Sequence, residues 1–145
     1  MTGSGSMDAE RAFTREARAR RRAALTRALR RVPAQCRALP VFDLPRVSRA
    51  GAIAAPVAGV RPIPLCAIRG TLEPSRASLF DDAFRPAAPA RRRWQSLWLA
   101  EQRGAVLPPI SVVPIGDGYA VRDGHHRVSV ARARGALAID ATIDG

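Results

Sequence analysis

The fold is decided by one stretch near the C-terminus, Asp123-Gly124-His125-His126-Arg127-Val128-Ser129-Val130-Ala131. Tyr119-Ala120-Val121 just before this stretch is predicted to form a strand, and His126 to Arg134 is predicted to form a helix. The first turn of such a helix leaves backbone N–H groups without acceptors and gives them partial positive charge. Gly124 permits a positive φ or a close approach, and Arg127 can fork onto phosphate oxygens. The stretch therefore predicts an anion site.

A plainer interpretation of this turn stays open. Asp123 would cap the helix, and the basic side chains would simply be solvated. The pattern is not a Walker loop, because no Gly-Lys-Ser/Thr follows it. A metal site built from His125 and His126 is not expected, since adjacent side chains on a turn point in different directions. Asp123 is also suited to holding a phosphate-bound Mg²⁺, a role compatible with capping.

Residues 60–145 predict a small α+β domain around this turn. Apolar spacing and turn signals define its elements. In chain order these are a strand over 63–68, loops over 70–76 and 80–84, a helix over 90–104, a hairpin over 107–121, the helix over 126–134 and a last strand over 139–143. This order predicts a mixed, partly antiparallel sheet with flanking helices.

Three segments precede that domain. Residues 1–7 read as a remnant of cloning, and residues 33–59 read as a linker or arm punctuated by Pro, Ala and Gly. Residues 8–32 lack Pro and Gly and predict an arginine-rich helix with a thin apolar stripe. This helix has three interpretations: it packs weakly on the domain, it binds nucleic-acid phosphates, or it mediates binding to a partner or a homodimer. The first is favoured.

The charge of the chain favours anionic partners. Its net charge is +12, and all 24 basic residues are arginines. Such a balance favours nucleotides or DNA, although an arginine-only composition is also typical of a GC-rich genome. No apolar run approaches the roughly 20 residues that a membrane span needs. Without a secretory signal either, we expect a cytoplasmic protein that does not contact membranes.

The two cysteines do not indicate a structural site. Cys36 and Cys66 lie 30 residues apart, outside any Cys-x-x-Cys pair. Neither a disulfide framework nor a structural metal site is expected, and two free thiols are the simplest interpretation.

Residues 60–143 resemble the ParB/sulfiredoxin superfamily in several ordered boxes. The decisive stretch resembles its third box, together with Gly135 and Ile139-Asp140-Ala141. Earlier boxes are matched by Ile63-Pro64-Leu65, by Glu73-Pro74-Ser75-Arg76 and by Pro109-Ile110. The resemblance implies a ParB/sulfiredoxin-like fold of the DGHHR type, which is also found in proteins labelled "ParB-like nuclease".

The resemblance also separates the possible activities. Sulfiredoxins carry a cysteine where this chain has His125, so sulfinic-acid reduction is not expected. Partitioning ParB proteins bind CTP through Gly-Glu-Arg-Arg, where this chain has Gly124-His125-His126-Arg127. They also carry a helix-turn-helix domain after this one, and none is expected before Gly145. ParB-like free-serine kinases are similar at Asp-Gly-x-His-Arg and need a carboxylate base, for which Glu73 is the nearest candidate. Gly70 stands where those kinases keep their acid.

The predicted function is therefore nucleotide binding with hydrolysis or phosphoryl transfer, using ATP or CTP and Mg²⁺. The alternative is a non-catalytic, partitioning-type DNA-binding protein. Phosphate binding is assigned to Gly124, His125, His126, Arg127 and Arg76, and catalysis to Glu73, Asp123 and His126. Arg76 is equally readable as a surface arginine paired with Glu73 or Asp81.

Two arginine runs are candidate nucleic-acid contacts. They are Arg20-Arg21-Arg22 in the first helix and Arg91-Arg92-Arg93 at the start of the second. A cationic helix start opposes the helix dipole, so an anionic partner would stabilise the second run. Trp94 and Trp98 follow it at helical spacing, which predicts core packing rather than a stacking platform for bases.

Overall fold

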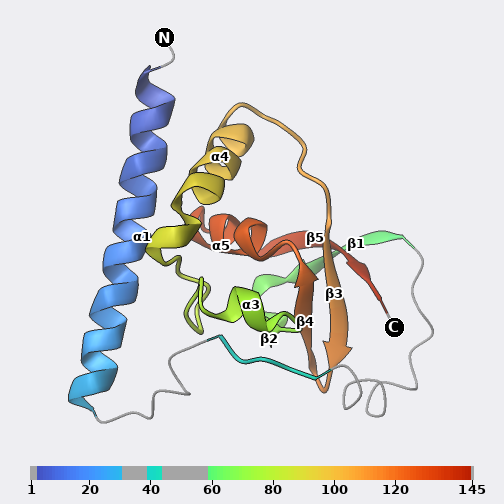
Figure 1. Cartoon of the computed structure of the whole chain (residues 1–145). Coiled ribbons are helices and arrows are strands. Elements are labelled where there is room, and N and C mark those ends of the chain that lie inside the picture. The colour runs from blue at the N-terminus through green and yellow to red at the C-terminus, as the bar shows by residue number, and fades with distance from the viewer. Residues whose placement is uncertain (1–2, 31–38, 44–58, 145) are drawn as a thin grey trace.

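The computed structural model describes residues 3–30, 39–43 and 59–144. Its helices and strands, in chain order, are α1 (Gly3–Leu29), β1 (Val60–Pro64), η2 (Leu65–Ala67), β2 (Ile68–Thr71), α3 (Pro74–Ala77), η3 (Ala88–Ala90), α4 (Arg91–Gln102), β3 (Ile110–Ile115), β4 (Gly118–Asp123), α5 (His125–Ala133) and β5 (Ala138–Ile143). Figure 1 shows α1 standing beside α4 and α5, which separate it from the sheet. The predicted α+β class with flanking helices is confirmed.

The five strands form one mixed sheet in the order β1-β5-β3-β4-β2. The pairs β1–β5 and β3–β4 are antiparallel, whereas β3–β5 and β2–β4 are parallel. The predicted hairpin is the β3–β4 pair. Pro62 and Pro64 lie in the edge strand β1, where a residue that lacks an N–H is tolerated.

The predicted strand over 63–68 is wrong as a single element. The chain forms β1, bends through η2 and starts β2 at Ile68. Ile63 and Leu65 are two positions apart but Ile68 comes three later, so all three are buried only if the chain turns between them. The loop predicted over 70–76 is also incorrect, since β2 reaches Thr71 and α3 starts at Pro74.

Part of the predicted linker is docked on the sheet. Val41 forms a parallel bridge with Thr71, and the Phe42 N–H donates to the Thr71 carbonyl at 2.8 Å. A Cβ at Gly70 would lie 2.2 Å from the Pro40 carbonyl oxygen, so this close approach requires glycine. The rest of the predicted linker, like Cys36 and the end of the predicted first helix, lies outside the described residues.

Both faces of the sheet are covered. Val112 and Val121 pack toward Val128 of α5, whereas Val113 and Ala120 point to the opposite face. There Phe42 of the docked segment covers them. The sheet is thus shielded by α5 on one side and by the segment 39–43 on the other.

The helix α1 packs on α4 and α5 through small residues and one ring. Ala9, Ala12, Phe13 and Ala17 are buried, and the Phe13 ring meets Trp94 edge-on at 5.6 Å. The helix begins at Gly3, five residues before the predicted start. Of the three interpretations of this helix, the described contacts agree with packing on the domain.

The predicted core role of the tryptophans is confirmed. Trp94 is completely buried, and its indole N–H donates to the Ser129 hydroxyl at 2.8 Å. Trp98 stacks on it with ring centroids 5.5 Å apart. These contacts fix how α4 lies against α5.

Candidate functional site

The turn after β4 has the left-handed geometry that the glycine predicted. Gly124 has a φ of 105° and caps α5, which begins at His125. A Cβ at this position would lie 2.4 Å from Cγ2 of Ile110. Glycine is therefore required both for the positive φ and for the close approach of the turn to β3.

The amide end of α5 is not capped by a side chain. The first helical bond runs from the Val128 N–H to the Gly124 carbonyl, so the three preceding N–H groups have no acceptor within the helix. Asp123 does not act as the expected cap. Its carboxylate, with a 73% exposed side chain, instead accepts from Nη2 of Arg127 at 2.9 Å.

Arg127 is largely committed to holding the backbone. Its Nη1 donates to the Pro108 and Pro109 carbonyls at 2.5 and 2.8 Å. With the bond to Asp123, three of the five guanidinium N–H donors are used. The arrangement ties α5 to the segment that enters β3, and it leaves less of Arg127 for phosphate than the sequence suggested.

His125 is a buried link between α5 and β2. Its Nε2 forms a hydrogen bond of 2.5 Å with the Thr71 hydroxyl, and the Glu73 N–H donates to that hydroxyl at 2.9 Å. Thr71 is itself fully buried, and no local pattern around it predicts this role. The bond fixes the orientation of the ring.

His126 lies between an aromatic ring and two arginines. Phe80 meets it edge-on with centroids 5.2 Å apart, and the residue is only 7% exposed. Burial, together with the positive charges of Arg93 and Arg76, lowers the pKa of His126 to about 4. Its imidazole is therefore neutral at pH 7.

The pKa of His125 is lowered in the same way. Burial is the largest cause, followed by the positive charge of Arg76 and by His126, and the value falls to about 4 although Asp123 opposes the shift. Both imidazoles can therefore donate one N–H without adding charge at neutral pH.

A small hollow brings all five predicted phosphate-binding residues together. Its volume is about 40 Å³, and it is lined by Arg76, Arg93, Leu97, Asp123, Gly124, His125, His126 and Arg127. Arg93, a predicted nucleic-acid contact, also lines this hollow. Arg76, for which the sequence allows two roles, lines the hollow and forms no ion pair with Glu73 or Asp81.

Other predicted residues lie elsewhere. Glu73 is exposed at the start of α3 and does not line the hollow. Arg91 packs its guanidinium over the Phe13 ring at 5.0 Å, and Arg92 is exposed on α4. The run Arg20-Arg21-Arg22 lies on α1, where the Nε of Arg20 is buried and the other two side chains are exposed.

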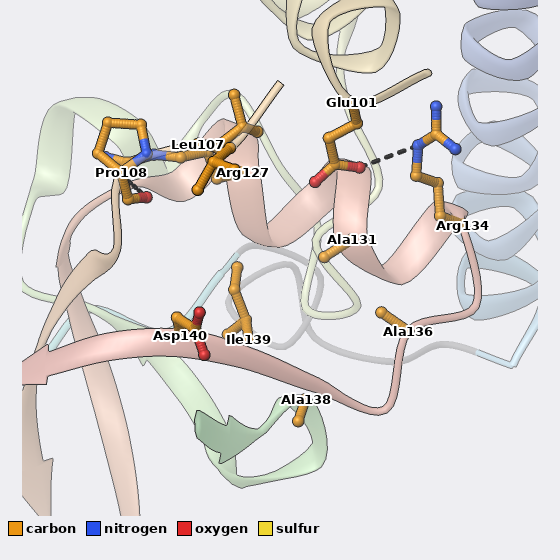
Figure 2. A pocket seen from close by; sticks show the side chains of 11 residues that line it. Glu101, Leu107, Pro108, Arg127, Ala131, Arg134, Ala136, Ala138, Ile139 and Asp140 are labelled. Atoms are coloured by element: carbon orange, nitrogen blue, oxygen red, sulfur yellow. Dashed lines mark hydrogen bonds and ion pairs between the residues drawn. The ribbon is translucent and has the colours of Figure 1, made fainter. Parts of the chain in front are cut away.

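A second, larger cavity shares Arg127 with the hollow and was not predicted. Figure 2 shows it between α5, β5 and the segment leading into β3. Its volume is about 300 Å³. The cavity stays open because the side chains of Ala131, Ala136 and Ala138 are short. At one end of it, Nε of Arg134 and Oε2 of Glu101 form an ion pair of 2.9 Å. Burial raises the pKa of Glu101, against the opposing effect of Arg134.

Further features of the molecule are an exposed thiol, its possible metal ligands and the hydropathy of its helices. Cys66 is exposed and lines a different groove with Arg132, away from the hollow. Within the described residues, no three His, Cys, Asp or Glu side chains gather as they would around a metal ion. Over the same residues, no helix has both the length and the apolar character of a membrane span.

Comparison with known proteins gives one structural likeness. No protein-family model and no curated protein matches the chain. The fold is similar to the crystal structure of sulfiredoxin from Arabidopsis thaliana, with 19% identity and a TM-score of 0.45 over 59% of this chain and 84% of that one. This distant likeness says nothing about the site, and the ParB/sulfiredoxin assignment stays a prediction.

Proposed function

We propose that the hollow at the start of α5 binds the phosphates of ATP or CTP with Mg²⁺, for hydrolysis or phosphoryl transfer. The observation that carries the proposal is the approach of two arginines, from two other helices, to the amide end of α5. Arg76 and Arg93 line the hollow, and neither forms an ion pair within the described residues. Two uncompensated cations beside a positive helix end favour an anion there.

The neutral imidazoles support the same assignment. Two protonated rings beside these arginines would repel them, whereas neutral rings supply hydrogen-bond donors at no such cost. A pKa of about 4 makes His126 a weak base at neutral pH, so we assign it to phosphate binding rather than proton transfer.

The size of the hollow limits what it holds. Its 40 Å³ exceeds the roughly 10–15 Å³ that a cavity needs to hold one water and is far below the roughly 300–1,000 Å³ of small-molecule pockets, so it suits a phosphoryl group and not a nucleoside. The exposed carboxylate of Asp123 stands at its rim and is the natural ligand for Mg²⁺. Glu73 precedes Arg76 on α3 and is our candidate base for an acceptor hydroxyl.

Matched variants on one helix test the binding site. Calorimetric titration with ATP and CTP in the presence of Mg²⁺ compares the wild type with Arg93→Gln and with Arg92→Gln, its exposed neighbour. Loss of a hydrogen bond to a charged group costs about 1.5–3 kcal/mol, so Arg93→Gln should weaken binding about tenfold or more. Arg92→Gln should leave it nearly unchanged. Absence of binding by the wild type, or equal losses in both variants, would overturn the proposal.

The histidines provide a direct reporter of the bound anion. They are the only two in the chain, so their NMR signals are readily assigned. A phosphate beside them stabilises the protonated rings, so saturation with ATP should raise both midpoints from about 4. Midpoints that stay fixed at saturation would place the phosphates away from this turn.

Catalysis is tested separately from binding. Release of inorganic phosphate, with and without candidate hydroxyl acceptors, is measured for the wild type and for Glu73→Gln. We expect Glu73→Gln to retain nucleotide affinity and to lose acceptor-dependent turnover. Full turnover by this variant would remove Glu73 from the mechanism.

A further inference from the structure

The helix α1 carries a line of arginines on the side that faces away from the domain. Its buried positions, from Ala9 to Ala17, face α4 and α5. Four exposed arginines follow a spacing of four, three and four residues, which places them on one face of a helix. We call them the outer arginine stripe: Arg11, Arg15, Arg18 and Arg22.

Most of this charge is not neutralised by neighbouring side chains. Within the described residues, Arg11, Arg18 and Arg22 form no ion pair. Arg15 contacts Glu16 at 3.6 Å, and its Nη2 turns back toward the domain and donates to the Ala133 carbonyl of α5 at 3.5 Å. After Glu16 the helix contains no acidic residue. Exposed Arg21 adds further charge next to the stripe.

We propose that the outer arginine stripe binds the phosphate backbone of double-stranded DNA. At about 1.5 Å per residue the stripe extends roughly 16 Å along a rigid helix. Duplex DNA carries about one negative charge per 1.7 Å of its axis, so a line of this length meets phosphates along all of it. Guanidinium groups also match phosphate geometry through paired N–H donors. Contacts of this kind do not read sequence.

The structure favours a duplex over an anionic membrane. A helix that lies on a membrane needs an open apolar face, and the apolar face of α1 is occupied by α4 and α5. Between Arg11 and Arg22 the outer face carries no large apolar side chain. Leu25 and Leu29 are exposed only beyond the end of the stripe.

The stripe is separate from the phosphate hollow. Its residues belong to α1, whereas the hollow is lined by residues of α3, α4, the turn before α5 and the first turn of α5. The two proposals therefore stand on different residues, and variants in one should leave the other intact.

The test measures how salt weakens binding of a fluorescent 20-base-pair duplex to the full chain. Four phosphate contacts predict a slope of log K against log[salt] of about −3.6. The variant R18Q/R22Q should reduce the slope by about 1.8, which corresponds to roughly 60-fold weaker binding at 0.1 M salt. The control R61Q/R69Q removes the same charge from exposed positions of β1 and β2 and should keep the wild-type slope.

Thermal unfolding and titration with ATP and Mg²⁺ verify that R18Q/R22Q is folded and that its phosphate hollow is unchanged. Absence of duplex binding by the wild type would overturn the stripe proposal. Equal losses of DNA affinity in R18Q/R22Q and R61Q/R69Q would also overturn it, because binding would then depend on the total charge of the protein and not on the stripe. Anionic phospholipid vesicles bound more tightly than DNA, and released by R18Q/R22Q, would assign the stripe to membranes instead.

Discussion

Acidification should destabilise the fold through two buried histidines. His125 and His126 are 4% and 7% exposed, and burial is the main reason that their pKa values fall to about 4. The folded-state pKa lies below the ordinary value near 6.5, so the fold binds these protons more weakly than the unfolded chain. The stability that the neutral rings contribute is therefore complete above pH 6.5 and is lost as the pH falls toward 4.

The size of the effect follows from the two pKa values. Between pH 7 and pH 5, a shift from about 6.5 to about 4 changes the free energy of unfolding by about 2 kcal/mol per histidine. Both together remove about 4 kcal/mol, a large part of the 5–15 kcal/mol typical of a domain. Most carboxylates stay ionised across this interval, so the histidines should dominate the loss.

Urea unfolding at pH 7, 6 and 5 measures this loss, in phosphate-free buffer so that no bound anion raises the pKa values. His126→Gln should show about half of the wild-type dependence on pH, whatever its stability at pH 7. An NMR titration gives the two midpoints independently. The reasoning is refuted if the midpoints lie near 6.5, or if the variant loses as much stability as the wild type between pH 7 and pH 5.

Three further substitutions test the packing that supports the site. Gly135→Ala meets no atom within 4 Å, so its positive φ alone should cost about 1–2 kcal/mol in urea unfolding. Gly124→Ala adds the clash with Ile110 and should cost about 1–3 kcal/mol more; equal losses would show that the turn is not pressed on β3. Ser129→Ala leaves the indole N–H of Trp94 unpaired and should cost about 1–3 kcal/mol, with a changed near-UV spectrum; an unaltered melting curve would contradict this.

The parts of the fold that the sequence predicted are those with local signals. Gly116 and Gly118 mark the β3–β4 turn, and Gly124 marks the start of α5, because each requirement lies within a few residues. The strand over 63–68 was misassigned because the change in spacing before Ile68 signals a bend only when the burial of all three residues is known. The docking of 39–43 on β2 could not be predicted from local sequence either, because it depends on the close approach of Pro40 to Gly70, 30 positions further along the chain.

The composition of the site depends on how two helices fit together. Trp94 is buried against Ser129 of α5, and this contact fixes the rotation of α4 about its own axis. Arg93 is the residue before Trp94, so the same rotation aims its side chain at the turn where α5 begins. The run Arg91-Arg92-Arg93 indicates positive charge at this helix start, but the sequence alone does not show which of the three arginines reaches the site. All three side chains are exposed, and packing gives two of them different neighbours: Arg91 lies over the Phe13 ring, and Arg93 lines the hollow. A buried aromatic residue thus selects which neighbouring cation serves the site.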